Sequence, residues 1–231
     1  MKALVLSSGG ADSTVCVALA VEKLGRENVA TVSFEYGQKH DRELICAQKI
    51  ADFYSLKHFV LSLENILKFS DCSLLKNSTQ AIEHKSYADQ IAEKGEGKVS
   101  TYVPFRNGLM LSSAAALAQS IYPEEDCEIW IGAHADDAAG QAYADCSSEF
   151  TQAMNQAISI GTYGLVKLAA PLVKFNKARV IKEGLRLKVP FELTWSCYEG
   201  HEKACGKCGT CIDRLNAFEE NGVKDPIPYE E

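Results

Sequence analysis

The first 61 residues of this 231-residue chain alternate between short apolar stretches and longer amphipathic ones. We expect strands at 2–7, 28–34 and 58–61, and helices at 13–24 and 41–53. Gly25 suits the end of the first helix, and Asp41 suits the start of the second. Because strand–helix–strand alternation is typical of a parallel sheet covered by helices, the pattern predicts an α/β fold.

The rest of the chain continues this pattern after a polar interruption. Residues 63–100 are polar and weakly periodic, so we expect an insert of two short helices and a mobile loop. Helices are expected at 107–120, 147–160 and 176–187, and a strand at 128–132. We therefore expect an α/β domain over 1–189 with the insert 63–100, and a small C-terminal segment, 190–231, packed on it.

Composition excludes several classes of partner. The formal charge of −7 disfavours a surface that coats nucleic acid, which needs a basic face. No stretch approaches the ~18 apolar residues of a membrane helix, and the apolar start is too short for a signal peptide. We expect a cytoplasmic protein with no direct nucleic-acid or membrane partner, in a compartment where structural disulfides are rare.

A glycine-rich loop joins the first strand to the first helix. Its paired glycines let backbone N–H groups converge on an anion, and the helix behind it points its positive end there. The serines add hydroxyl donors, and Asp12 suits a divalent cation. An ordinary strand-to-helix turn is the alternative, but the pattern favours nucleotide binding. The phosphate-binding candidates are Ser7, Ser8, Gly9, Gly10, Ala11, Asp12 and Ser13.

Four of the nine cysteines lie within fifteen residues: Cys197, Cys205, Cys208 and Cys211. Two overlapping CxxC steps present thiolates to one tetrahedral ion, so we predict a structural zinc with all four positions filled by protein. An iron–sulfur cluster is the first alternative, although the spacing differs from the familiar bacterial run. A redox CxxC pair is the second, although it leaves two cysteines unexplained.

These motifs carry a resemblance to a known family. The loop SGGADS is similar to the PP-loop of the ATP pyrophosphatases, which cleave ATP between its α and β phosphates to adenylate a substrate. The tail, with TWSCYEG at 194–200 and CGKCGTCIDR at 205–214, resembles that of the QueC family within this group. Further matches follow in order: FEYGQKH at 34–40, VPFRN at 103–107, YADC at 143–146, and APL at 170–172 with NKA at 176–178.

The chain departs from the family pattern at two positions. Ala144 stands where the family has proline, and Ser147 stands where it often has arginine. Both lie where the resemblance places the substrate. A related ligase that passes the same carboxylate to another amine therefore stays open. So do a PP-loop tRNA-modifying enzyme and a nonenzymatic nucleotide-binding or zinc-scaffold module.

The resemblance implies a fold, a reaction and a set of cofactors. The fold is Rossmann-like, of the adenine nucleotide alpha hydrolase type, with a small zinc-binding segment at the C-terminus. The reaction converts 7-carboxy-7-deazaguanine and ammonia to 7-cyano-7-deazaguanine through adenylated carboxylate and amide intermediates, in queuosine precursor biosynthesis. The implied cofactors are ATP, Mg²⁺ and one structural Zn²⁺ per chain, and the implied assembly is a homodimer.

Such a reaction needs charge neutralisation at phosphates and carboxylate more than it needs a protein nucleophile. The catalytic candidates that follow from the resemblance are Asp12, Lys39, Arg106, Asp137 and Lys177. The two aspartates are expected to hold Mg²⁺, and the three cations to offset negative charge on ATP or on the substrate. Arg106, Tyr143 and Asp145 are expected to contact the deazaguanine, whose amino group and ring N–H suit an acidic partner.

Overall fold

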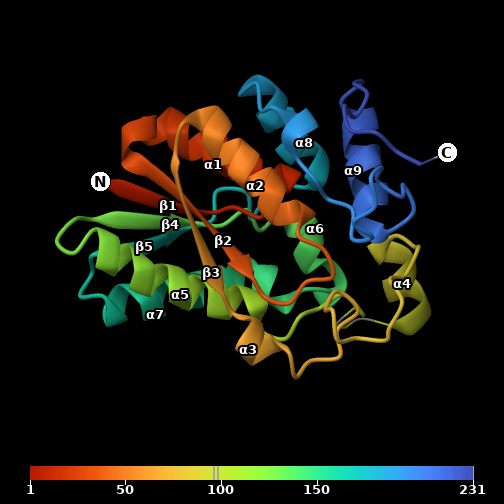
Figure 1. The fold of residues 1–231 in the computed structure, drawn as a ribbon, viewed down its shortest axis with the longest axis horizontal. Coiled ribbons are helices and arrows are strands. Elements are labelled where there is room, and N and C mark those ends of the chain that lie inside the picture. The colour runs from red at the N-terminus through yellow and green to blue at the C-terminus, as the bar shows by residue number, and fades with distance from the viewer. Residues whose placement is uncertain (96, 98, 231) are drawn as a thin grey trace.

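The computed structural model describes residues 1–95, 97 and 99–230. Its centre is a five-stranded parallel sheet of order β3-β2-β1-β4-β5. In Figure 1 the strands of this sheet run between two groups of helices. The strands are β1 (Lys2–Leu6), β2 (Val29–Glu35), β3 (Lys57–Ser62), β4 (Cys127–Trp130) and β5 (Val166–Ala169). Because the chain moves to β2 on one side of β1 and to β4 on the other, a crevice forms at the carboxyl end of β1.

Helices cover both faces of the sheet, as the sequence pattern predicted. In Figure 1, α1, α2 and α8 lie over one face and α5 and α7 over the other. The helices are α1 (Ala11–Leu24), α2 (Arg42–Tyr54), α3 (Glu64–Leu67), α4 (Tyr87–Lys94), α5 (Arg106–Ile121), α6 (Ala135–Ala138), α7 (Ser148–Gly161), α8 (Lys177–Arg186) and α9 (Gly209–Glu220). Among the described residues no helix has the length and apolarity needed to cross a membrane.

The core lies in two apolar layers, one on each side of the sheet. Strand β1 shows why: Ala3 and Val5 join the layer under α1 and α8, whereas Leu4 and Leu6 join the layer under α5. Alternate residues of a strand point to opposite faces, so a strand buried on both faces must be apolar throughout. This explains why the residues of β1 that follow Lys2 are all apolar.

Helix ends follow local sequence signals where these are strong. Gly25 ends α1 with φ of 79°, and its N–H donates to the Val21 carbonyl, as expected of a glycine C-cap. Asp41 precedes α2 as predicted, but its side chain accepts no capping hydrogen bond. Strand β5 was not expected, because a four-residue strand carrying Lys167 lacks a clear period.

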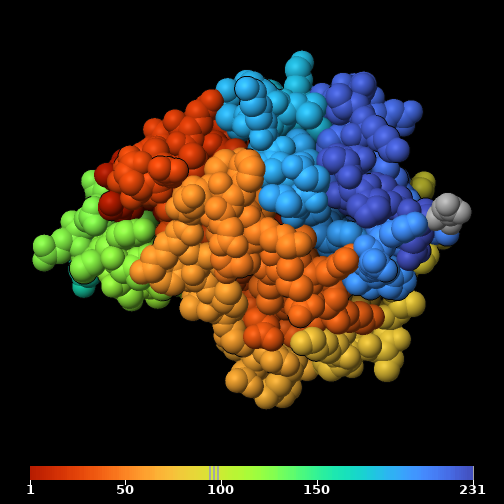
Figure 2. Space-filling model, turned by 45° about the horizontal axis from the view of Figure 1, so that its top comes forward, coloured from red at the N-terminus to blue at the C-terminus, as the bar shows by residue number. Residues whose placement is uncertain are grey.

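The insert and the C-terminal segment meet beyond the carboxyl ends of the strands. The insert contains the two short helices expected of it, α3 and α4. Figure 1 places α4 beside α9, and a hydrogen bond of 2.7 Å joins the hydroxyls of Tyr87 and Tyr198. Figure 2 shows the C-terminal residues, in blue, lying against the orange surface of the chain that includes α2. Segments far apart in sequence therefore meet at this end of the sheet.

Candidate functional site

A cavity of about 230 Å³ opens at the carboxyl ends of β1, β2 and β4. Its lining comes from the loop 7–13, the start of α2, the start of α5, the loop after β4, and the C-terminal segment. Five residues of the predicted phosphate loop take part: Ser7, Ser8, Gly10, Asp12 and Ser13. The cavity thus occupies the crevice at which open α/β sheets bind ligands.

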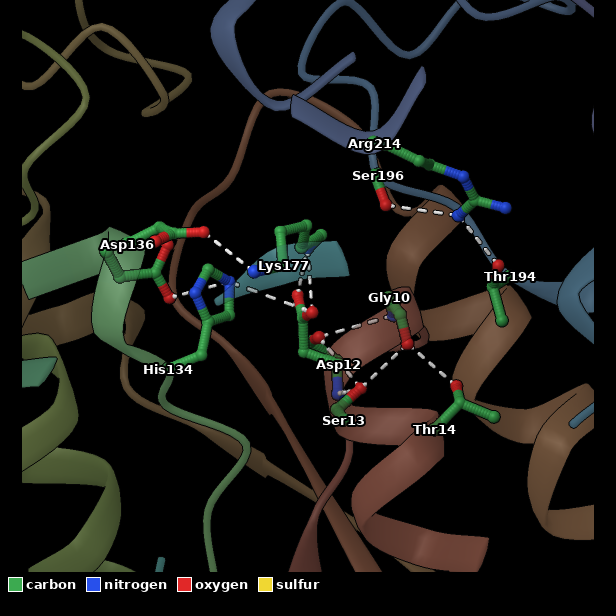
Figure 3. A network of polar contacts seen from close by, with 12 residues as sticks. Gly10, Asp12, Ser13, Thr14, His134, Asp136, Lys177, Thr194, Ser196 and Arg214 are labelled. Carbon is green, nitrogen blue, oxygen red and sulfur yellow. Dashed lines mark hydrogen bonds and ion pairs between the residues drawn. The ribbon is translucent and has the colours of Figure 1, made fainter. Parts of the chain in front are cut away.

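The loop 7–13 depends on Gly9 for its path. Gly9 has φ of +76°, and a Cβ there would lie 2.3 Å from the backbone oxygen of Glu43 in α2. Only glycine permits both the conformation and the approach. The Ser13 hydroxyl donates to the Gly10 carbonyl at 3.2 Å, and the Thr14 hydroxyl donates to it at 2.7 Å (Figure 3).

The start of α1 offers donors to an anion. Gly10 occupies the N-cap position and supplies no side-chain cap, so the N–H groups of the first turn receive no capping side chain from it. The helix dipole adds partial positive charge at the same point. Loop and helix together form a cradle suited to phosphate.

An ion pair crosses the cavity between the loop and α8. Lys177 Nζ lies 2.7 and 2.5 Å from the two carboxylate oxygens of Asp12 (Figure 3). Burial would raise the pKa of Asp12, but the charges of Lys177 and His134 outweigh it and hold that pKa below its usual range. Two residues 165 positions apart, both predicted from the sequence, therefore lie in direct contact.

Asp137 lies on the same side of the cavity. The Nε2 atom of the buried His134 is 3.4 Å from Asp137 and 3.7 Å from Asp12. Burial, together with the charge of Asp12, raises the pKa of Asp137 despite the opposing effect of His134. Asp213 of α9 also lines the cavity. Carboxylate oxygens converging beside a phosphate cradle are a donor set that suits Mg²⁺.

Arg106 and four tyrosines form the other side of the cavity. Arg106 begins α5, donates to the Tyr36 hydroxyl at 3.0 Å, and lies 5.2 Å from the centre of that ring. The Tyr87 hydroxyl is 2.7 Å from that of Tyr198 and 3.3 Å from that of Tyr143. This side therefore offers one fixed cation and several hydroxyl groups to a ligand.

Two of the predicted catalytic and substrate-binding residues are not brought to the cavity. Lys39 is exposed, and its ammonium donates to the Gln80 carbonyl at 3.0 Å. Asp145 is buried, but its carboxylate accepts from the backbone N–H of Asn107 at 3.0 Å and so caps the start of α5. Neither belongs to the cavity lining, whereas Arg106, Asp137, Tyr143 and Lys177 do.

The four clustered cysteines form a compact site at the start of α9. All four are buried, and their sulfur atoms lie within 4.8 Å of one another. Three backbone N–H groups approach two of the sulfurs: that of Cys205 faces Cys197, and those of Lys207 and Cys208 face Cys205, at 3.3–3.4 Å. Such contacts favour thiolates, so the donor set fits a single tetrahedral metal ion.

The cysteine site connects to the cavity through Arg214, whose side chain is fully buried. Arg214 forms a two-point ion pair with Asp225, and its Nη1 donates to Thr194 at 2.8 Å and to Ser196 at 3.2 Å (Figure 3). Ser196 lines the cavity and directly precedes Cys197. The cysteine site and the cavity wall are therefore parts of one connected structure.

Comparison with known families decides the assignment. The family model for queuosine biosynthesis protein QueC matches residues 2–222. The chain belongs to the QueC family. This QueC family member carries the family resemblance along its full α/β core and through its cysteine site, as the motifs in its sequence indicated.

Curated relatives agree with the family model. This QueC family member is 40% identical over 230 residues to the 7-cyano-7-deazaguanine synthase of Caldicellulosiruptor saccharolyticus, covering 100% of this chain and 96% of the relative. It is 41% identical over 231 residues to the synthase of the same name from Oceanobacillus iheyensis, covering 99% and 98%. Both relatives are named synthases, and the chain is accordingly an enzyme.

A solved structure supports the fold. The chain resembles the NMN synthetase of Francisella tularensis with a TM-score of 0.51, covering 96% of this chain and 78% of that one at 14% sequence identity. At this identity the likeness shows the shared α/β architecture alone. The predicted parallel sheet flanked by helices is thus confirmed by the topology of the chain and by this neighbour.

Sequence reasoning missed several residues that line the cavity. Glu43 in α2 and Tyr87 in α4 lie in segments that carried no chemical motif. Trp195, Ser196 and Tyr198 stand beside Cys197 in sequence, and this adjacency was the available signal for them. A cavity built from distant segments becomes visible only once the fold places them together.

Proposed function

We propose that this chain is a cytoplasmic, homodimeric 7-cyano-7-deazaguanine synthase. It would convert 7-carboxy-7-deazaguanine and ammonia to the nitrile at the expense of ATP. The observation that carries the proposal is a single cavity with a phosphate cradle on one side and Arg106 among tyrosines on the other. Relatives about 40% identical bear the name of this activity.

The phosphate side suits ATP cleavage between the α and β phosphates. In our proposal the loop 7–13 and the start of α1 bind the β and γ phosphates, which leave as pyrophosphate. Lys177 lies against this loop and offsets charge that develops on the departing group. Asp12 and Asp137 would hold Mg²⁺, whose role is to neutralise phosphate charge.

The first half of the reaction turns the carboxylate into an amide. Arg106 binds the substrate carboxylate and directs one oxygen to the α-phosphorus of ATP. The P–O bond to pyrophosphate breaks as the acyl–adenylate bond forms. Ammonia then attacks the carbonyl carbon and expels AMP, which carries away one carboxylate oxygen, while a proton passes to solvent.

The second half removes the remaining oxygen. The amide oxygen attacks a second ATP in the same cavity, releasing pyrophosphate and forming an adenylated imidate. Loss of AMP and of the nitrogen-bound protons leaves the carbon–nitrogen triple bond. Each step needs orientation and charge neutralisation, which the cavity provides, and no protein nucleophile. Cys146 lines the cavity, but burial raises the pKa of its thiol well above the usual range, which suits no nucleophilic role.

We propose that the cysteine site holds one structural Zn²⁺. With Zn–S bonds of about 2.3 Å, tetrahedral geometry sets the sulfurs about 3.8 Å apart. Sulfur atoms within 4.8 Å of one another suit this geometry better than an iron–sulfur cube, whose separate irons hold the cysteine sulfurs further apart. Metal analysis of the purified protein should find about one zinc per chain, and iron in its place would contradict the assignment.

The function can be tested by following products. Purified protein is incubated with ATP, Mg²⁺, 7-carboxy-7-deazaguanine and ammonium, and the mixture is analysed by mass spectrometry. We expect the nitrile to accumulate after a transient amide. A reaction that stops at the amide would indicate the related ligase that passes the same carboxylate to another amine. A reaction that forms no AMP would contradict the proposal.

A further inference from the structure

The side chain of Glu43 contributes to the lining of the cavity. Glu43 lies in the first turn of α2 and is half-buried. Within residues 1–95, 97 and 99–230, no hydrogen bond and no ion pair engages this carboxylate. A half-buried carboxylate in the cavity wall that is not engaged by the protein is available to accept hydrogen bonds from a ligand.

The charged groups around Glu43 place it on the Arg106 side of the cavity. Burial raises the pKa of Glu43, and the neighbouring charges of His40 and Arg106 oppose that rise. The guanidinium of Arg106 donates to the Tyr36 hydroxyl instead of pairing with Glu43. His40 Nε2 lies 3.1 Å from the Tyr198 carbonyl. Glu43 and Arg106 thus share one side of the cavity, and each presents its charge to a bound molecule.

The other carboxylates of the cavity lining lie around Lys177. Asp12 is paired with Lys177, and Asp137 and Asp213 lie near that pair. Asp145 caps α5 and does not line the cavity. Glu43 is therefore the carboxylate that can serve a ligand bound against Arg106.

A carboxylate in this place selects the hydrogen-bonding edge of the ligand. A guanine-like ring presents a ring N1–H and a 2-amino group as adjacent donors, and a carboxylate has two oxygens that accept both. The edge of adenine offers a lone pair at N1, which a carboxylate repels. Charge-assisted bonds of this kind are stronger than those between neutral groups.

We propose that Glu43 accepts hydrogen bonds from the N1–H and 2-amino groups of the deazaguanine while Arg106 binds its 7-carboxylate. This inference rests on the proposed function and names the residue that selects a guanine-type ring. Among the described residues no hydrogen bond or ion pair joins Glu43 to Arg106, so in this proposal each of them binds a different group of the substrate. Asp145 has a stabilising role at α5 instead.

The test compares two ligands by calorimetry at pH 7.5. One is 7-carboxy-7-deazaguanine, and the other is the same molecule without its 2-amino group. We expect the wild type to bind the amino compound about tenfold more tightly, because a charge-assisted hydrogen bond is lost with the amino group. Glu43→Gln should weaken binding of the amino compound by roughly 10- to 100-fold and bring the two ligands within about threefold of each other.

Three measurements keep the result interpretable. Affinity for a nonhydrolysable ATP analogue should stay within about twofold of the wild type in Glu43→Gln. The exposed Glu64→Gln, in α3 and outside the cavity lining, is the matched control and should bind both ligands as the wild type does. Thermal unfolding verifies that each variant is folded, and Glu43→Asp, which keeps the carboxylate but shortens it, replaces Glu43→Gln if that variant does not fold.

Two results would overturn the inference. A Glu43→Gln variant that keeps the wild-type preference for the amino compound would exclude recognition of that group by Glu43. Loss of affinity for the ATP analogue, with ligand preference intact, would assign Glu43 to the nucleotide. A wild type that binds and converts neither deazapurine would instead contradict the proposed function itself, so the two failures are distinguishable.

Discussion

The two-point contact between Lys177 and Asp12 links the loop 7–13 to α8. Lys177 is buried, and Asp12 is partly exposed to the cavity. In our proposal the ammonium therefore lies where charge develops when pyrophosphate leaves. A fixed cation of this kind costs no rearrangement during the reaction.

Replacing Lys177 tests this position. Lys177→Met should lower the rate of pyrophosphate release by about 10²- to 10³-fold, because a preorganised charge at the leaving group is lost. The exposed Lys174→Met is the matched control and should retain full activity. If Lys177→Met released pyrophosphate at a rate within threefold of the wild type, Lys177 would not be the cation that stabilises the leaving group.

The ionised carboxylate of Asp137 should lower the stability of the fold and yet be needed for activity. Its raised pKa means that the folded protein pays to keep this carboxylate ionised, so that stability falls as the pH rises from about 3.8 through the raised value. Asp137→Asn should therefore raise the melting temperature at pH 7, and the gain should shrink as the pH falls toward 4. The same variant should lose ATP cleavage.

The control for Asp137→Asn is a variant that replaces an exposed carboxylate. Asp126→Asn should change the melting temperature little at either pH, since this side chain lies on the surface. A melting temperature of Asp137→Asn at or below that of the wild type at pH 7 would show that ionised Asp137 stabilises the fold.

The sequence indicated which side chains could serve a phosphate site more readily than it indicated which of them would reach the cavity. Asp12, Lys177 and Arg106 lie in motifs, and the fold brings all three to the cavity. Lys39 also lies in a motif, yet it is exposed outside the lining. Glu43 lies four positions further along in sequence and reaches the cavity because α2 begins there. Lys39 lies in the segment before α2, where its side chain bonds to the Gln80 carbonyl instead, and no property of the residue itself reveals this.

At the scale of elements, the loop 7–13 and α2 fit together through Gly9. A side chain at this position would meet the α2 backbone and would require an unfavourable φ of +76°. Gly9→Ala should therefore destabilise the protein by about 1–3 kcal/mol, measured by chemical denaturation, and weaken nucleotide binding. Gly222→Ala, with φ of +68° and open space around its Cβ, separates backbone strain from the clash.

Gly222→Ala should bind nucleotide normally and lose less stability than Gly9→Ala. Equal loss of stability in both variants, with unchanged nucleotide affinity, would mean that the close contact between the loop 7–13 and α2 contributes neither to stability nor to nucleotide binding.

Elements with strong periodic signals were predicted well. The alternation at the start of the chain gave β1, α1, β2, α2 and β3 within two residues at each end. Strand β5 was missed because four residues are too few to show a period, and pairing with β4 holds it in place. Helix α9 was missed because its first turn consists of the glycine- and cysteine-rich metal motif, which reads as a loop.

At the scale of the whole molecule, the cavity depends on the C-terminal segment. Trp195, Ser196, Thr210 and Asp213 line it, and the backbone N–H of Trp195 donates to the Gly9 carbonyl at 2.8 Å. The cysteine site positions these residues because Cys197 directly follows Ser196 and Cys211 directly follows Thr210 in the chain. Sequence motifs identified the cysteine cluster as a candidate metal site, but its position near the loop 7–13 became visible only in the fold.

Removing the proposed zinc should therefore affect nucleotide binding before it unfolds the sheet. Treatment with a strong zinc chelator should lower the melting temperature and weaken binding of an ATP analogue, while far-ultraviolet circular dichroism stays near native. Restoring zinc should reverse both effects. Metal-free protein with full nucleotide affinity would show that the cysteine site is independent of the cavity.

The central claim is that ATP activates both oxygens of the carboxylate in turn. The most direct test uses 7-carboxy-7-deazaguanine labelled with ¹⁸O at both carboxylate positions, with mass spectrometry of the AMP formed. We predict two molecules of singly labelled AMP for each nitrile, since each adenylate leaves with one substrate oxygen. Unlabelled AMP, or label in inorganic phosphate, would contradict the account.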